Sequence, residues 1–131
     1  MIKTVRNFIG ENDPPTFTLF NVNGKSPVLL VCDHASNIFP LSMGDFGLKQ
    51  KDMRRHIAWD IGAKNVTQII SKKLDAPAIL AGYSRLVIDL NRKPGDPESI
   101  PEVSDSTSIL GNLKLTKKQI KEREEIFFWP Y

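Results

Sequence analysis

The sequence predicts an α/β fold, and three features of it carry that prediction. Residues 27–32 are an unbroken apolar run that ends in Asp33-His34, as in a strand buried on both faces. Residues 61–74 show the apolar spacing of a helix, and two further apolar runs follow at 78–83 and 86–90. A strand, a helix and a second strand make a βαβ unit with a right-handed crossover.

The segments before this unit predict an extended lead-in, a short edge strand and a turn. Residues 1–15 are polar and suggest an extended lead-in, whereas residues 16–20 alternate in polarity and predict a short edge strand. Asn23-Gly24 is a strong turn signal and links this strand to the run at 27–32.

The predicted helix has one apolar face and is preceded by an acidic residue. Asp60 stands where a carboxylate favours a helix N-terminus, and residues 51–59 predict a separate short helix. Asp75-Ala76-Pro77 ends the helix. Lys64, Gln68, Ser71 and Lys72 take the opposite side, and the apolar face comprises Ile61, Val66, Ile69, Ile70 and Leu74.

The second half of the chain contains a long loop and a final helix. Residues 78–90 are either two strands or one strand broken near Ser84, and residues 91–112 are a loop long enough to suggest function. Thr116 with Gln119 forms a capping-box pattern before a helix at 117–128. The aromatic end, residues 125–131, either docks on the sheet or is followed by more chain, and we expect the second. We treat 1–131 as a single domain.

Composition restricts the function classes. The 131 residues carry 18 basic and 15 acidic side chains, for a net charge of +3, and the basic residues are scattered. We therefore expect no nucleic-acid partner. The lack of a long apolar run argues against a membrane protein, and the polar N-terminus predicts a cytoplasmic one. A single cysteine excludes an internal disulfide and a cysteine-rich zinc site.

Polar residues gather after the predicted strands. His34 follows the first strand, while Arg85, Asp89, Asn91 and Arg92 surround the last one. Because the carboxyl ends of parallel strands meet at one crevice, these residues could face a common ligand. Alternatives remain open: His34 could be a loop or capping residue, Asp89 could form a structural salt bridge with Arg85 or Arg92, and Asn91-Arg92 could cap a turn instead of holding a carboxylate.

A metal site has an incomplete set of ligands in this sequence. His56 and Asp60 are four residues apart, which would place them on one helix face, where they could bind a metal or simply hydrogen bond. His34 with Asp60 or His56 supplies two ligands, whereas catalytic zinc usually takes three. No third ligand is evident.

Three motifs resemble the N-formylglutamate amidohydrolase family. Residues 31–37 (Val-Cys-Asp-His-Ala-Ser-Asn) are similar to its first signature and residues 56–63 (His-Ile-Ala-Trp-Asp-Ile-Gly-Ala) to its second. Residues 83–92 (Tyr-Ser-Arg-Leu-Val-Ile-Asp-Leu-Asn-Arg) resemble the third and are the most specific. Gly111-Asn112 and the final Trp-Pro-Tyr also follow the family pattern.

The resemblance implies a fold and a reaction. The fold is a three-layer α/β/α arrangement with a mixed, mostly parallel sheet, similar to zinc carboxypeptidases. The reaction is metal-dependent hydrolysis of N-formylglutamate, a small acidic substrate, to formate and glutamate, with a place in histidine degradation. Zinc, or another divalent metal, is the implied cofactor.

The resemblance also implies residue roles. His34 and Asp60 would bind the metal, since Asn37 stands where zinc carboxypeptidases have a ligating Glu. Asn91 and Arg92 would hold a substrate carboxylate, assisted by Arg85. The implied supporting residues are Asp33, Ser36, Asn37, His56 and Asp89.

Family members are longer than this chain. We therefore expect an incomplete domain, the N-terminal half, with a further ligand and the general base beyond Tyr131 and with little activity of its own. Two other classes stay open: a non-catalytic domain that binds a carboxylated small molecule, and a module that presents the aromatic C-terminal segment to a partner or to a second copy of itself.

Overall fold

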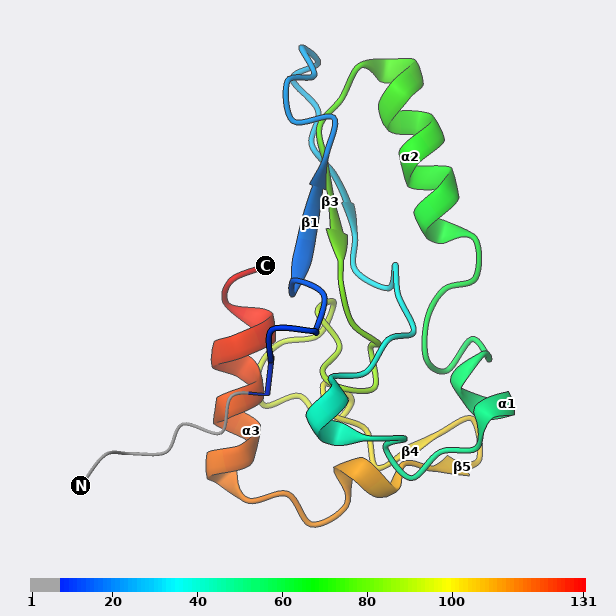
Figure 1. The fold of residues 1–131 in the computed structure, drawn as a ribbon, viewed down its shortest axis with the longest axis vertical. Helices are drawn as coiled ribbons and strands as arrows, with labels where there is room; N and C mark the ends of the chain where they lie inside the picture. The colour runs from blue at the N-terminus through cyan, green and yellow to red at the C-terminus, as the bar shows by residue number, and fades with distance from the viewer. Residues whose placement is uncertain (1–7) are drawn as a thin grey trace, which may run out of the picture.

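A computed structural model describes residues 8–131 of the chain (Figure 1). A three-stranded sheet and the helix α2 (Ala63–Leu74) form one end of the molecule. Turns, short helices and a small hairpin form the other end, where most of the core lies. The predicted lead-in at 1–15 lies partly outside the described residues.

The main sheet has the order β1-β3-β2. Strand β3 (Ala78–Ala81) is central; it pairs antiparallel with β1 (Phe17–Phe20) and parallel with β2 (Leu30–Cys32). The predicted edge strand and the turn at Asn23-Gly24 are confirmed, and the Gly24 amide donates to the Asn21 carbonyl at 2.9 Å. The turn nevertheless joins two strands that do not pair with each other, since β3 lies between them. The sheet is mixed, with one pair of each kind, so "mostly parallel" is wrong for this part of the chain.

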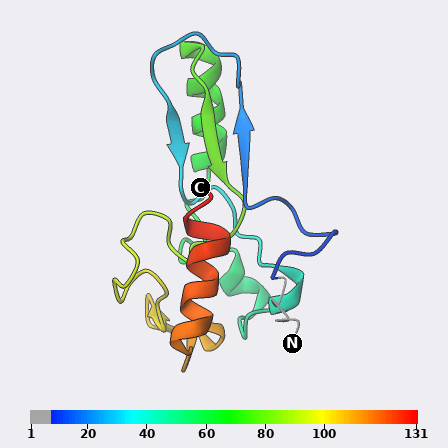
Figure 2. The same cartoon turned by 90° about the vertical axis from the view of Figure 1, so that its left-hand side faces the viewer.

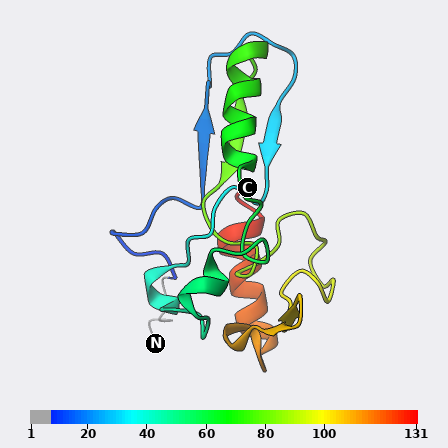
Figure 3. The ribbon, with the colours of Figure 1, turned by 90° about the vertical axis from the view of Figure 1, so that its right-hand side faces the viewer.

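The burial predicted for residues 27–32 is wrong. Strand β2 covers only three of these residues, and Val31 is 56% exposed, whereas Cys32 is buried. Within residues 8–131, β2 is an edge strand with α2 on one face of the sheet only (Figures 2 and 3). A strand in this position buries alternate side chains, those that point toward the helix.

Helix α2 is confirmed, but its predicted orientation is wrong. Gly62, at a φ of 86°, precedes it, and Asp75 in the left-handed region ends it. The predicted apolar face is largely exposed, and Ser71, predicted on the polar side, is fully buried. Small side chains four residues apart let the helix approach the sheet closely. These are Ala63, Thr67 and Ser71.

The second predicted strand of the 78–90 region, residues 86–90, is wrong. Leu86, Val87 and Ile88 are buried, but Leu86 and Val87 lie in a turn and Ile88 has no regular secondary structure. The Ser84 hydroxyl accepts a hydrogen bond from the Leu86 amide, and the Val87 amide donates to the Ser84 carbonyl. This local bonding competes with a strand and turns the chain at the end of β3.

Short elements complete the other end of the molecule. The predicted short helix at 51–59 shrinks to α1 (Gln50–Met53), and the predicted loop at 91–112 contains a hairpin of β4 (Val103–Ser104) and β5 (Thr107–Ser108). Two 3-10 helices are η1 (Leu41–Met43) and η2 (Leu110–Asn112).

The final helix begins as predicted. Thr116 and Gln119 form a capping box before α3 (Lys117–Arg123), which continues as a π-helical segment, η3 (Glu124–Phe128). The aromatic end docks in part: Phe127 is buried against Tyr83, with ring centroids 5.3 Å apart, whereas Trp129 is 66% exposed. Self-association through this segment stays a prediction.

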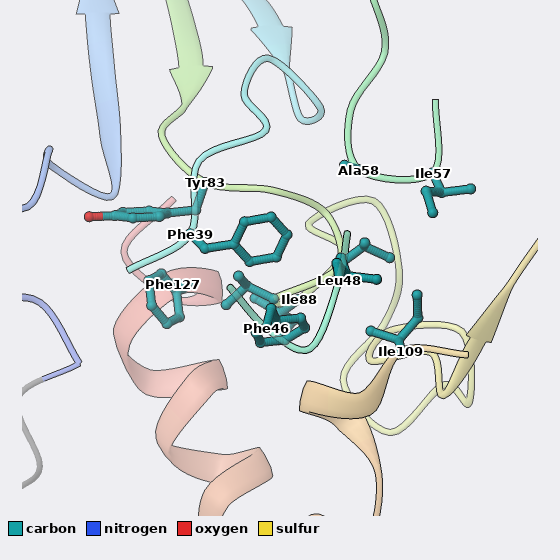
Figure 4. Packing of buried hydrophobic residues seen from close by; sticks show 11 residues of the cluster. Phe39, Phe46, Leu48, Ile57, Ala58, Tyr83, Ile88, Ile109 and Phe127 are labelled. Atoms are coloured by element: carbon teal, nitrogen blue, oxygen red, sulfur yellow. The ribbon is translucent and has the colours of Figure 1, made fainter. Parts of the chain in front are cut away.

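The main core lies under the turns and α3 (Figure 4). Arg123 is buried within it and donates hydrogen bonds to the Val87 carbonyl, the Gly111 carbonyl and Asn112 Oδ1. The core residues labelled in Figure 4 are Phe39, Phe46, Leu48, Ile57, Ala58, Tyr83, Ile88, Ile109 and Phe127.

The fold class is α/β, but residues 8–131 do not show the expected three layers. One helix covers one face of the sheet, and the opposite face carries no second helical layer within the described part (Figure 2). No helix in this part is long and apolar enough to cross a membrane.

Candidate functional site

Backbone hydrogen bonds join the three sequence motifs at the ends of β2 and β3. The Asp60 amide donates to the His34 carbonyl at 3.1 Å, and the Arg85 amide donates to the Ala58 carbonyl at 3.2 Å. The buried Ser84 hydroxyl also donates to the Ala58 carbonyl. These bonds place His34, Asp60 and the segment that carries Arg85 side by side.

His34 lies between two carboxylates. Its Nε2 is 2.7 Å from Asp89 Oδ1, and its Nδ1 is 3.2 Å from Asp60 Oδ2. Asp89 is almost fully buried, with 4% of its side chain exposed, whereas Asp60 is 53% exposed. The ring therefore has a buried carboxylate on one side and a solvent-accessible one on the other.

The pKa shifts of His34 and Asp89 follow from this packing. Burial opposes a charge on His34, but the hydrogen bond and negative charge of Asp89 outweigh it and raise the pKa of the imidazole. Burial would raise the pKa of Asp89, but hydrogen bonds from His34 and from the Asn91 amide, with the positive charges of His34 and Arg85, lower it. The native state thus favours an imidazolium beside a carboxylate.

Arg85 joins the two carboxylates from the other side. Its guanidinium lies 2.9 Å from Asp89 Oδ2 and 3.3 Å from Asp60 Oδ1. The predicted pairing of Asp89 with Arg85 is confirmed, and Arg92 is not its partner. Arg85 is consequently already engaged with two acidic groups.

Arg92 instead lines a cavity of about 240 Å³ with Arg85, Asp89 and Glu98. Its guanidinium is 3.0 Å from the exposed carboxylate of Glu98. Asn91 is exposed and does not line this cavity; its backbone amide donates to Asp89. Glu98 was missed in the sequence, where only the length of the loop around it suggested a function.

The predicted supporting residues hold the loops around the site. Tyr131 donates to Asp33 at 2.7 Å, and the Asn37 amide group donates to the Met53 carbonyl at 2.9 Å. The Ser36 hydroxyl accepts from the Ile38 amide.

The predicted pairing of His56 with Asp60 on a helix face is wrong. Residues 54–59 form turns, not a helix. His56 Nε2 lies 3.5 Å from Asp105 Oδ2, and Arg55 contacts the same carboxylate at 2.6 Å. His56 thus belongs to a surface cluster with the β4–β5 turn.

The donor set near His34 fits part of a metal site. Imidazole nitrogen and carboxylate oxygen are common zinc ligands, and a buried carboxylate behind the second ring nitrogen is the usual support for a ligating His. His34 Nδ1 and Asp60 Oδ2 are placed for this, with Asp89 behind. No group of three such side chains converges within residues 8–131, because Asp89 faces the other ring nitrogen.

The sequence profile of the N-formylglutamate amidohydrolase family matches residues 26–131. The chain belongs to this family. The match includes all the site residues described above. A search of curated proteins gave no match.

A solved relative in this comparison has a very similar fold. It is described as the crystal structure of gene product Atu2144 from Agrobacterium tumefaciens, with a TM-score of 0.93 and 34% sequence identity. The alignment covers 95% of this amidohydrolase-family chain and 50% of the relative. The chain therefore spans about half the length of that protein.

Proposed function

We propose that this site serves the hydrolysis of the N-formyl amide of N-formylglutamate, or of a closely related N-acyl amino acid. The carrying observation is the arrangement of His34 between Asp60 and the buried Asp89, in a member of this amidohydrolase family. Water adds to the formyl carbon, the C–N bond breaks, and the released amine takes up a proton, which yields formate and glutamate.

His34 Nδ1 and Asp60 would hold a divalent metal, with zinc the best match to the donors. A metal held there would supply Lewis-acid polarisation of the formyl carbonyl and activation of water. Asp89 accepts a hydrogen bond from Nε2–H of His34 and so directs Nδ1 toward Asp60. Arg85 pairs with both carboxylates and orients them.

The cavity beside the site would bind the acidic substrate. N-formylglutamate carries two carboxylates, and Arg85 and Arg92 both line the cavity. Arg92 is the more available of the two, because its partner Glu98 is exposed and can be exchanged for a substrate carboxylate. Asn91 does not line this cavity, and its backbone amide instead donates to Asp89.

This chain by itself should turn over substrate slowly. Residues 8–131 bring two metal donors together, and a general base contributes about 10²–10⁴-fold to a rate. We therefore expect this chain to bind the metal and the ligand but to release little formate.

Zinc binding and ligand binding test the two parts of this proposal separately. In equilibrium dialysis with zinc, His34→Ala and Asp60→Ala should each lose most of the bound metal, whereas His56→Ala should retain it. In calorimetry with glutamate, Arg92→Ala should weaken binding and Glu98→Gln should strengthen it. Zinc binding unaffected by His34→Ala, or glutamate binding unaffected by Arg92→Ala, contradicts the corresponding assignment. Robust formate release from N-formylglutamate by this chain would contradict the expected slow turnover.

A further inference from the structure

The β4–β5 hairpin forms one wall of the cavity beside the candidate site. Val103, Ser104 and Asp105 line this cavity together with Arg85 and Arg92, the two cations proposed to bind the substrate. The hairpin has only two residues in each strand. A hairpin this short is at best marginally stable in isolation, so its position depends on contacts with the rest of the chain.

The base of the hairpin is fixed in the core. Ile109, which is fully buried directly after β5, donates its amide hydrogen to the Glu102 carbonyl at 2.8 Å. The buried side chain of Asn112 donates to the Pro101 carbonyl at 2.7 Å. These bonds hold the two ends of the hairpin, but neither reaches its tip.

Arg55 holds the tip. One guanidinium nitrogen, Nη2, lies 2.6 Å from Asp105 Oδ2, and the other, Nη1, donates to Thr107 Oγ1 at 2.8 Å. His56 Nε2 approaches the same Asp105 carboxylate at 3.5 Å, but its side chain is 68% exposed. Asp52 Oδ1 accepts from Nη1 of Arg55 at 3.0 Å and so orients the guanidinium. Arg55 thus contacts both sides of the hairpin turn from the segment directly after α1 (Figure 1).

The backbone of Arg55 is itself tied to the core. Its amide donates to the Asp52 carbonyl at 3.1 Å, and its carbonyl accepts from the Ala58 amide at 3.0 Å. Ile57 and Ala58, which follow closely, are buried. Arg55 does not line the cavity, so it acts on the cavity through Asp105.

We propose that Arg55 is a positioning residue for substrate binding, which holds Asp105 and the β4–β5 hairpin in place as a wall of the cavity. The role of Arg55 rests on the proposed function, because that function makes this cavity the site of the acidic substrate. A wall that opens for part of the time lowers the apparent affinity in proportion to the fraction of molecules in which the cavity is formed.

The charge of Asp105 makes the proposal testable by the sign of one effect. A carboxylate at the cavity repels an anionic ligand, so its removal strengthens glutamate binding if Asp105 acts through its charge alone. If Asp105 is instead the contact through which Arg55 holds the wall, its removal weakens glutamate binding. Removal of Arg55 weakens binding in both cases, so the Asp105 variant decides between them.

Calorimetry with glutamate and the metal-free chain measures these effects. Arg55→Ala and Asp105→Gly should each raise the Kd by at least about fivefold, and Arg55→Lys should recover part of the loss. Glycine suits this position because the φ of Asp105 is 43°. Both variants remove the same contact, so the double variant should bind no more weakly than Arg55→Ala. Ser106→Gly, at the neighbouring turn position with a φ of 58°, is the matched control and should bind within about twofold of the wild type.

Hydrogen exchange of residues 103–108 measures the anchoring without a ligand. Exchange should be at least about fivefold faster in Arg55→Ala and in Asp105→Gly than in the wild type, with circular dichroism unchanged. Asp105 lies at the hairpin tip and is 54% exposed, so its variant keeps the test decisive if Arg55→Ala does not fold.

Two outcomes would overturn the proposal. One is glutamate binding that Asp105→Gly strengthens or that Arg55→Ala leaves unchanged, and the other is unchanged exchange at residues 103–108 in both variants. A wild-type chain that does not bind glutamate would contradict the proposed function, whereas the exchange result would still decide whether Arg55 holds the hairpin.

Discussion

Replacement of Asp89 by Ala should destabilise the fold strongly. The Asp89 carboxylate accepts from His34 at 2.7 Å, from Arg85 at 2.9 Å and from the Asn91 amide at 2.9 Å. Removal of one member of a buried ion pair typically costs about 3–5 kcal/mol. Arg85 would keep its contact with Asp60 and is 27% exposed, so water can hydrate it. We therefore expect the lower end, about 3 kcal/mol.

Urea denaturation at pH 6, without metal, measures this loss as a shift of the midpoint at constant slope. Asp89→Asn should lose less, about 1–2 kcal/mol, because the amide oxygen still accepts from His34. Glu125→Ala is the control: Glu125 pairs with Lys121 at 3.7 Å on the surface, so its loss should be below about 1 kcal/mol. A loss for Asp89→Ala no larger than that of the control would refute the view of Asp89 as the buried anchor of the site.

Three further outcomes are expected. The metal-free protein should lose stability in urea as the pH rises above about 6.5, because the raised pKa of His34 stabilises the fold below the unfolded-state value and this contribution disappears as the pH passes the folded-state pKa. The lowered pKa of Asp89 stabilises the fold above about pH 3.9, the unfolded-state value. This stabilisation is lost as the pH falls through the folded-state pKa. His34→Gln should flatten the upper slope, and an unchanged slope would count against the ion pair. Arg123→Met should cost about 2–4 kcal/mol in the same assay, since the buried carbonyls of Val87 and Gly111 lose their donor, whereas the exposed Lys121→Met should change little. Thr116→Ala removes the cap of α3 and should cost about 1 kcal/mol, measured by thermal unfolding followed at 222 nm; no change there would mean that the capping box is not needed for α3.

Local chemistry in the sequence is sufficient for several elements. The capping box at Thr116 and Gln119, the turn at Asn23-Gly24 and the end of α2 at Asp75 each depend on residues close together in the chain. The backbone and capping hydrogen bonds that define them are each made within a few residues of the chain. The alternating residues before Asn21 likewise form the predicted edge strand β1.

Burial was the property that local pattern did not determine. The apolar residues Val31 and Val66 look like core in the sequence, yet both are exposed. Periodicity shows which side chains share a face, but the packing of elements decides which face is covered. Ser71 and Thr67 show the same effect in reverse, since close approach of α2 to the sheet selects small side chains over large ones.

The site divides in a similar way between sequence and structure. The residue types and their order along the chain were sufficient to select His34, Asp60, Arg85 and Asp89, and the expected partner of Asp89 was among the two alternatives. Only the tertiary structure decided that Asp89 and Asp60 contact opposite nitrogens of one ring, and that Arg92 pairs with Glu98. These contacts join residues far apart in the sequence, and no local pattern encodes such distances. The physical reason is that His34 gains its two carboxylates when β2, the turn before α2 and the turn after β3 are brought together by folding.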